Sequence, residues 1–134
     1  LLVAAPSLRR QVTQLKQPQH ISELPFVANT ALREPCNWSF SRSELERQSV
    51  TVHPVISLDA TLAVREAVRH GAGLSVLPDF AVADDLKSGT LIQVLPRWSL
   101  PSGGIHAVFP TARFRPAKVK AFVDLMQEQI RSRA

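Results

Sequence analysis

The sequence has little cysteine and no long apolar run, and both absences narrow its function. Cys36 is the only cysteine in the 134 residues, so no intrachain disulfide and no multi-cysteine metal cluster can form. A reducing compartment is the natural inference. The opening Leu-Leu-Val-Ala-Ala is too short for a signal peptide, and no apolar run approaches the roughly 18 residues of a membrane span. We therefore expect a cytoplasmic protein with no membrane contact.

Motifs for metal binding and catalysis are also lacking. The histidines fall on different predicted elements without a close pair, whereas metal motifs space their ligands closely: His20, His53, His70 and His106. Ser75 lacks the second glycine of a nucleophile elbow, so we interpret it as a core strand residue. Gly71-Ala72-Gly73 ends a predicted helix instead of opening one, which argues against a dinucleotide fingerprint. Nothing near Cys36 obviously activates its thiol. We expect no enzyme activity, cofactor or bound metal.

Two further groups of residues have ordinary structural interpretations. Asp84-Asp85 and Glu44/Glu46 fall in polar turns, where a solvated face is favoured over an acid/base pair with contrasting environments. Trp38 and Trp98 are large apolar residues that most often pack. Trp98 lies in a segment rich in proline and glycine, so it is also a candidate lid.

The composition itself is that of a globular domain. The 134 residues are 45% hydrophobic and 20% charged, which suits one domain with a buried core. The net charge of +5 comes from scattered basic residues, most dense between Arg113 and Lys120. Such a charge favours anions in general, and no DNA-reading motif accompanies it. The chain starts without methionine, inside a predicted strand, so we expect a fragment of a longer protein.

The segment from Ser57 to Pro78 organises the chain. Asp59 or Ser57 is placed to cap a helix, and the helix has apolar positions spaced by three and four residues. Gly71 ends this helix, Gly73 permits a sharp turn, and an apolar run that is short enough for a buried strand follows. A helix N-terminus that follows a strand is a common site for a small polar or anionic ligand.

The other predicted elements alternate between strands and helices. Strands are expected at 1–5, 25–28, 38–40, 49–56, 90–95 and 105–109, helices near 6–13, 79–86 and from 115 onward, a single turn at 21–24, a solvated turn at 41–48 and a linker at 96–104. This alternation predicts an α/β fold with a mostly parallel sheet.

Polar residues gather at two predicted element ends. Asn29 and Thr30 end the second strand, and Ser57, Asp59 and Thr61 stand at the start of the central helix. Open α/β sheets hold ligands at the carboxyl ends of their strands, so we expect Asn29 and Thr61 to contact a ligand. Asp59 is either a plain helix cap or a cap that also contacts the ligand.

One series of short motifs runs through nearly the whole chain. Its parts are Leu1-x-Val3-Ala4-Ala5-Pro6-Ser7, Asp59, Ala67-Val68, Gly71-x-Gly73-Leu74-x-x-Leu77-Pro78, Asp85-Leu86-x-x-Gly89-x-Leu91-x-x-Val94-Leu95-Pro96, Ile105-x-Ala107-Val108-Phe109-Pro110, Arg113, Pro116-x-Lys118-Val119 and Ala121-Phe122-Val123. Each motif is weak by itself. In this order and with these spacings, they resemble the effector-binding domain of LysR-type transcriptional regulators.

The resemblance implies an α/β fold of the periplasmic-binding-protein type 2 kind. In that fold, two α/β subdomains are joined by two crossover strands and hold a small effector in the cleft between them. Residues 6–103 would be the second, complete Rossmann-like subdomain, while residues 1–5 and 104–134 would be the crossover strands and the closing helix of the first. The family's winged helix-turn-helix, its linker helix and the first half of the first subdomain have no counterpart in this sequence.

The resemblance also implies an effector site and partners. The cleft wall in this chain would consist of Asn29, Thr30, Ser57, Leu58, Asp59 and Thr61, with Val108 and Phe109 at the hinge. The function implied is that of a ligand-sensing domain whose effector shifts an equilibrium between subunit arrangements. Contact with DNA would run only through the missing N-terminal domain, and the domains would pair as homodimers or tetramers.

Two points stay open at the level of sequence. The helix N-terminus favours an effector with a carboxylate, whereas an ionised Asp59 would favour a hydroxyl or an amine. A solute-binding module of the same fold, with no role in DNA binding, is the alternative function, and an upstream export signal would support it. An α/β enzyme would require a nucleophile or an acid/base pair in the cleft.

Overall fold

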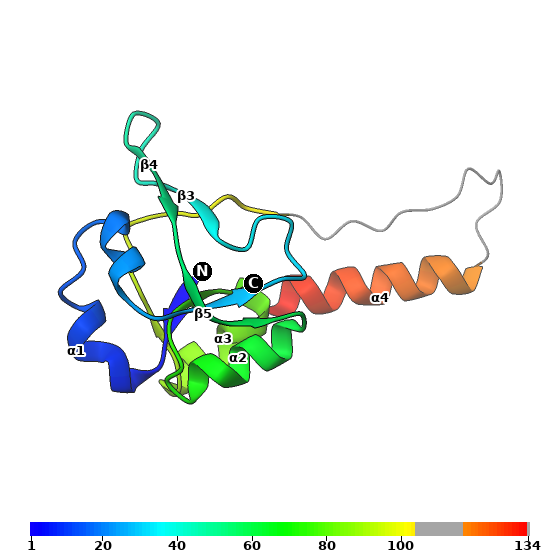
Figure 1. The fold of residues 1–134 in the computed structure, drawn as a ribbon. Coiled ribbons are helices and arrows are strands. Elements are labelled where there is room, and N and C mark those ends of the chain that lie inside the picture. The colour runs from blue at the N-terminus through cyan, green and yellow to red at the C-terminus, as the bar shows by residue number, and fades with distance from the viewer. Residues whose placement is uncertain (104–116, 134) are drawn as a thin grey trace. The chain divides into compact units, whose positions relative to one another are not determined.

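The computed structural model describes residues 1–103 and 117–133, which belong to two compact units (Figure 1). The first unit runs from Leu1 to Pro101 and the second from Ser102 to Ala134. The elements of the first unit are β1 (Leu2–Ala4), the 3₁₀ helix η1 (Pro6–Leu8), α1 (Arg9–Val12), the 3₁₀ helix η2 (Pro18–Glu23), β2 (Phe26–Asn29), β3 (Asn37–Ser41), β4 (Arg47–Thr51), β5 (Pro54–Leu58), α2 (Thr61–Arg69), β6 (Ser75–Val76), α3 (Asp79–Ser88) and β7 (Ile92–Gln93).

The strands of the first unit form a mixed sheet beside a separate hairpin. β1 lies between β6 and β7 and is antiparallel to both, whereas β2 and β5 are parallel. Leu74 joins these two groups of strands: its N–H donates to the Pro25 carbonyl and its carbonyl accepts from Val27, both at 2.8 Å. Apart from the hairpin β3–β4, the strands therefore follow the order β5, β2, β6, β1, β7.

The expected mostly parallel sheet is wrong in one respect. The predicted alternation of strand and helix is present, and the helix α3 does connect two strands that run the same way, β6 and β7. β1 is inserted between them and runs in the opposite direction. Element order along the chain indicates which strands a helix connects, but it carries no information about a strand placed between them.

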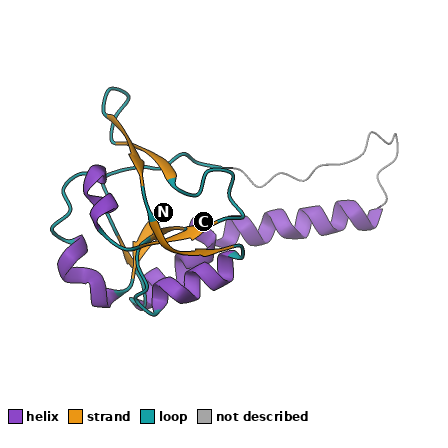
Figure 2. Ribbon diagram, in the orientation of Figure 1, coloured by secondary structure: helices purple, strands orange, loops and turns teal. Residues whose placement is uncertain are grey.

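The alternation of side chains along the strands divides the interior into two cores. Val3 packs with residues of α2 and α3, while its neighbours Leu2 and Ala4 pack in the other core with Phe26 and Trp98. Successive side chains of a strand point to opposite faces of the sheet, so one short strand contributes to both. In Figure 2, α2 and α3 lie side by side against the strands.

The central segment folds largely as predicted. α2 ends at Arg69, and Gly71 follows the helix with φ +81°, a left-handed conformation that favours glycine. Gly73 has a different reason for being glycine, because a Cβ there would lie 2.4 Å from the Pro25 carbonyl oxygen. This close backbone approach is what lets Leu74 bond to β2. The predicted short strand follows as β6, and α3 begins at Asp79.

The hairpin corrects the predicted boundaries between residues 41 and 56. β4 already begins at Arg47, inside the expected turn, and the expected strand 49–56 is divided into β4 and β5. β5 begins at Pro54. β4 starts early because Arg47 already pairs with Ser41 of β3, which leaves residues 42–46 as the tip of the hairpin. Figure 1 shows this hairpin extending away from the sheet.

The expected linker at 96–104 is also partly wrong. Trp98 is 8% exposed and belongs to a hydrophobic core, so it packs and is no lid. The backbones of Ser99 and Ser41 exchange two hydrogen bonds, of 2.7 and 2.8 Å. These contacts hold the segment up to Leu100 on the first unit, and the boundary between the units falls after Pro101.

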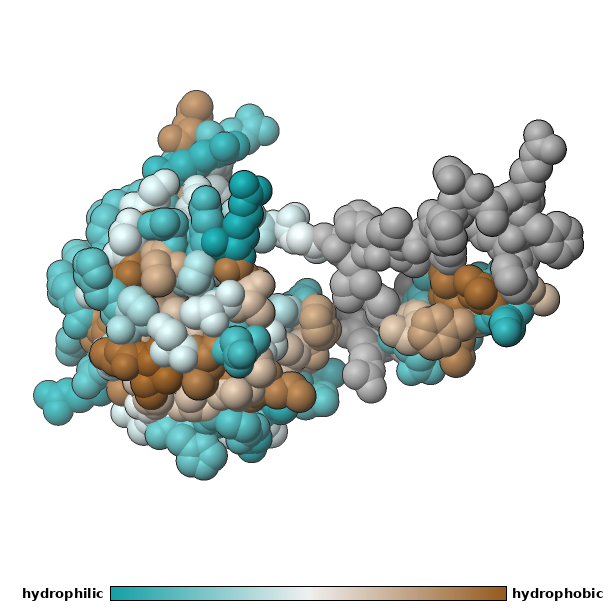
Figure 3. All heavy atoms as spheres, turned by 45° about the vertical axis from the view of Figure 1, so that its right-hand side comes forward, coloured by the Kyte–Doolittle hydropathy of each residue, from teal (hydrophilic) through white to brown (hydrophobic). Residues whose placement is uncertain are grey.

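The second unit contains α4 (Ala117–Arg133), the predicted final helix. Phe122, Leu125 and Met126 on this helix are 63%, 55% and 45% exposed. Figure 3 shows apolar surface on both units. The predicted strand at 105–109, with Val108 and Phe109, lies outside the described residues. Within the described ranges, no helix is long and apolar enough to span a membrane.

Candidate functional site

The carboxyl ends of β2 and β5 bring the predicted site residues together. The two strands pair in parallel with Asn29 opposite Leu58, so both strands end at the same edge. The Thr30 N–H donates to the Leu58 carbonyl at 2.8 Å, and the Thr30 hydroxyl donates to the same oxygen at 3.2 Å. The structure therefore places Asn29, Thr30 and Leu58 in one cluster, as the strand-end argument predicts.

Asn29 connects this edge to the start of α2. Its side chain is buried, with 3% exposure, and its Nδ2 donates to Thr61 Oγ1 at 3.1 Å. Its Oδ1 accepts from the Ala31 N–H at 3.2 Å. Because Thr61 Oγ1 accepts the bond from Asn29, the hydroxyl proton of Thr61 is available to donate elsewhere. Asn29 thus positions the hydroxyl of Thr61 at the helix N-terminus.

The expected cap of α2 by Asp59 or Ser57 is wrong. β5 continues through Leu58 and the helix begins at Thr61, so Ala60 occupies the N-cap position and no side chain caps the helix. Ser57 remains in the strand, and both Ser57 and Asp59 are exposed. The first-turn N–H groups of α2 therefore have no side-chain acceptor, and they stand beside the Thr61 hydroxyl as donors.

A partly buried ion pair joins α2 to α3. The Asp85 side chain is 5% exposed and lies 2.5 Å from Arg65 Nε and 3.6 Å from Arg69 Nε. The hydrogen bond to Asp85 raises the pKa of Arg65 above its ordinary value, more than partial desolvation lowers it. The expectation that Asp84-Asp85 is a solvated pair holds for Asp84, which is exposed, and is wrong for Asp85. Helical spacing indicates the burial of Asp85, because residues three positions apart share a helix face and Asp85 follows the apolar Val82 by three.

The other candidate groups have structural partners or lie apart. Ser75 is buried in β6 and its hydroxyl donates to the Val27 carbonyl at 2.8 Å, which confirms it as a core strand residue. Cys36 is a free, half-buried thiol. Among the described residues, no three histidines, cysteines, aspartates or glutamates come together in a way that could hold a metal ion.

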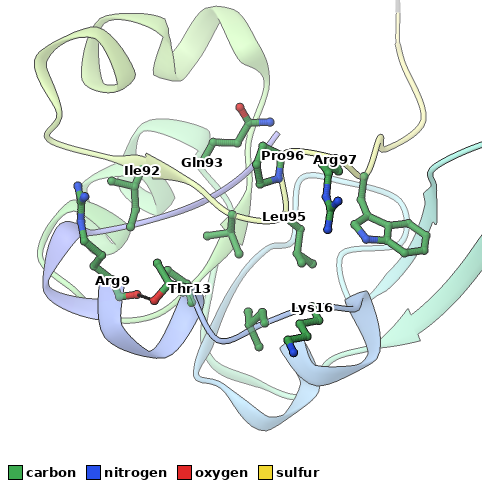
Figure 4. Close-up of a pocket in the computed structure, with 12 residues that line it drawn as sticks. Arg9, Thr13, Lys16, Ile92, Gln93, Leu95, Pro96 and Arg97 are labelled. Atoms are coloured by element: carbon green, nitrogen blue, oxygen red, sulfur yellow. Dashed lines mark hydrogen bonds between the residues drawn. The ribbon is translucent and has the colours of Figure 1, made fainter.

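The structure also has a hollow that the sequence did not indicate. It has a volume of about 440 Å³ and lies between α1 with its following turn and the segment from Ile92 to Trp98 (Figure 4). Its apolar lining residues belong to or pack against the core on the face of the sheet away from α2. Two segments that are distant in sequence, residues 9–16 and 92–98, form it, and no local pattern joins them.

Comparison with known proteins shows the family of the chain. The family profile of the LysR substrate binding domain matches residues 1–131. The chain belongs to this family. Its curated relatives include the HTH-type transcriptional regulator PtxR of Pseudomonas aeruginosa, which is 38% identical over 96% of the chain, and an HTH-type transcriptional regulator of Xanthomonas campestris, which is 32% identical over 92%. The LysR-type chain covers 41% and 37% of these two proteins.

Solved structures of LysR-type regulators share the fold. The CrgA regulatory domain of Neisseria meningitidis aligns with 96% of this chain at a TM-score of 0.75 and 18% identity, and 62% of that domain is covered. The AphB regulatory domain of Vibrio vulnificus aligns with 92% of the chain at a TM-score of 0.68 and 21% identity, with 61% of it covered. These likenesses establish the periplasmic-binding-protein type 2-like α/β fold of the LysR substrate-binding domain.

Proposed function

We propose that this LysR substrate-binding domain senses a small effector at the carboxyl ends of β2 and β5 and at the N-terminus of α2. One observation carries the proposal: Asn29 holds the Thr61 hydroxyl beside a helix N-terminus that has no side-chain cap. These donors stand at the edge of the sheet where α/β folds bind ligands. Thr30, Ser57, Leu58 and Asp59 border the same edge.

The donor set favours an effector with a carboxylate or a similar acceptor. First-turn N–H groups and the positive end of the helix dipole both stabilise an anion. Asp59 is exposed, so its charge is screened by water and opposes such an anion less than a buried carboxylate would.

The remaining assignments follow the family. Residues 6–103 would form one wall of the cleft, residues 1–5 and 104–134 would be the crossovers and closing helix of the other subdomain, and Val108 and Phe109 would lie at the hinge. The chain covers well under two thirds of its curated relatives. We propose that contact with DNA is made by a helix-turn-helix outside this chain, in a cytoplasmic homodimer or tetramer, and that the domain catalyses no reaction.

The Thr61→Val substitution tests this site. In the full-length regulator, a panel of small carboxylic acids and their amides is screened by thermal shift, since a ligand that binds only the folded state raises the unfolding midpoint. We expect acids to be preferred, and Thr61→Val to weaken the best acid about tenfold, as the loss of one hydrogen bond implies. Each shift is measured against the variant's own midpoint, because the bond from Asn29 is lost too.

Thr51→Val is the matched control, since the same change falls on β4 away from this edge. If Thr61→Val binds the acid as tightly as Thr51→Val does, the site assignment fails.

Self-association is a second expected outcome. Large apolar side chains are exposed on both units, among them Val55, Leu62, Phe80 and Phe122, which are 61%, 68%, 62% and 63% exposed. Exposed apolar surface of this kind favours association. We expect light scattering to give a mass above that of one chain and rising with concentration. A monodisperse monomer at all concentrations would contradict this prediction.

A further inference from the structure

The hollow between α1 and the segment after β7 has the size of a small-molecule site. Its volume of about 440 Å³ falls within the range of roughly 300–1,000 Å³ that is typical of such pockets. Its apolar lining residues belong to or pack against the core on one face of the sheet, whereas α2, which begins with Thr61, packs in the core on the other face. The hollow is therefore separate from the site at the strand ends.

The floor of the hollow is apolar and well packed. Val12, Val94, Leu95 and Trp98 line it and are 6%, 3%, 7% and 8% exposed. An apolar ligand body in the hollow would lie against these side chains. The indole of Trp98 offers a flat, rigid contact for it.

The rim is positively charged. Arg9, Lys16 and Arg97 are exposed and line the hollow, and no acidic residue is among the side chains that line it. None of the three takes part in an ion pair among the described residues. In Figure 4, Arg97 and Lys16 come from the two different segments that form the hollow, with Leu95 drawn between them, while Arg9 lies beside Ile92. An anionic group at this rim would meet cations with no competing carboxylate among the lining residues.

A strained residue holds this rim in place. Leu95 has φ +52°, and the Trp98 N–H donates to its carbonyl at 2.9 Å to close a tight turn. Leucine rarely adopts a left-handed conformation, and such strain is kept where the surrounding structure holds it, often at ligand clamps. The turn puts the Trp98 ring into the floor and leaves Arg97 exposed at the rim.

We propose that this hollow binds a small amphiphilic carboxylate. Its apolar body would lie against Val94, Leu95 and Trp98, and its carboxylate would lie at the rim, where Arg97 and Lys16 supply the cations. An apolar floor with a few convergent polar groups is the usual design of a small-ligand pocket, and an uncompensated cationic rim selects the anion. This site goes beyond the effector site proposed above and does not depend on it.

Tryptophan fluorescence with octanoate as the probe tests the proposal. Trp38→Phe leaves Trp98 as the reporter and removes an indole N–H that is buried without a partner. In this background, octanoate is expected to change the emission of Trp98 saturably, and 1-octanol, which has the same apolar body without the charge, to bind at least about tenfold more weakly. Binding of octanoate should weaken as salt is added, because the cations are exposed.

Two double variants distinguish the effect of the rim cations on octanoate binding from the effect of the protein's net charge. Lys16→Gln with Arg97→Gln is expected to weaken octanoate about tenfold, which corresponds to the loss of two exposed charge contacts. Arg10→Gln with Arg33→Gln removes the same charge from exposed positions that do not line the hollow, and it should bind octanoate as before. Far-UV circular dichroism verifies that both variants fold.

Several results would overturn the proposal. The proposal fails if octanoate causes no saturable change in Trp98 emission, or if octanol and octanoate bind equally well. It also fails if the two double variants lose the same octanoate affinity, or if the change in emission follows self-association measured by light scattering.

Thr61→Val must leave octanoate binding unchanged. If that variant abolishes it, the carboxylate binds at the strand ends and the hollow is no site. If octanoate binds at the rim while Thr61→Val has no effect on the effector acid, the effector site fails and the hollow stands.

Discussion

Gly73→Ala is expected to destabilise the first unit by about 3 kcal/mol. The new methyl group would lie 2.4 Å from the Pro25 carbonyl oxygen and 2.7 Å from its carbonyl carbon. Both are backbone atoms held by the bonds that join Leu74 to β2, so they cannot move aside as the end of a side chain could. Overpacking of a rigid interior costs about 1–3 kcal/mol or more. Urea unfolding followed by circular dichroism measures the loss.

Gly89→Ala is the matched control for this result. Gly89 has φ +75° and ends α3, but no atom lies within 4 Å of the position of an added Cβ. Alanine there meets only the backbone strain of the left-handed conformation, about 1 kcal/mol. Equal losses in the two variants would show that the junction between Leu74 and Pro25 is looser than the structure has it.

Asp85→Asn is expected to cost about 2–3 kcal/mol. The carboxylate is buried and accepts from Arg65 at 2.5 Å, with Arg69 at 3.6 Å. Removing one partner of a buried ion pair leaves the other charge uncompensated, which costs about 3–5 kcal/mol when both are fully buried. The two arginine side chains keep 25% and 34% exposure, so water offsets part of this loss. The free energy of unfolding in urea, compared with that of the unchanged chain, gives the value.

Asp84→Asn removes the same charge from the neighbouring, exposed position. A change below about 0.5 kcal/mol is expected there, as for most surface substitutions. A double-mutant cycle of Asp85→Asn with Arg65→Gln then measures the interaction free energy of the pair. Once one partner has been replaced, replacing the other should cost much less stability. If the losses from Asp85→Asn and Arg65→Gln simply add, the ion pair does not hold α2 against α3.

Short-range patterns in the sequence were sufficient for most of the elements. The existence of α2, its end before Gly71, and α3 followed by Gly89 depend on apolar spacing and glycine conformation, which neighbouring residues determine. The boundary between β4 and β5 did not follow from these patterns, because β-branched residues continue across it. Pairing with β3 decides where β4 lies, and that partner is set by tertiary structure.

The candidate site was predictable in part. Asn29 and Thr30 end one strand and Leu58 another, and parallel pairing makes such ends meet. The bond from Asn29 to Thr61 was not predictable, since it joins residues 32 positions apart. The absence of a cap was missed because Asp59 is a good capping residue, whereas the extra length of β5 moved the helix start to Thr61.

By itself, the sequence determined the family, the alternation of strands and helices, and the strand ends that carry polar residues. These depend on motif order and local spacing, which are properties of the chain read along its length. Only the tertiary structure decided that β1 runs antiparallel between β6 and β7, that Asp85 is buried against Arg65, and that Arg9, Lys16 and Arg97 surround one hollow. Each of these results from residues distant in sequence that pack together, and local pattern does not encode such contacts.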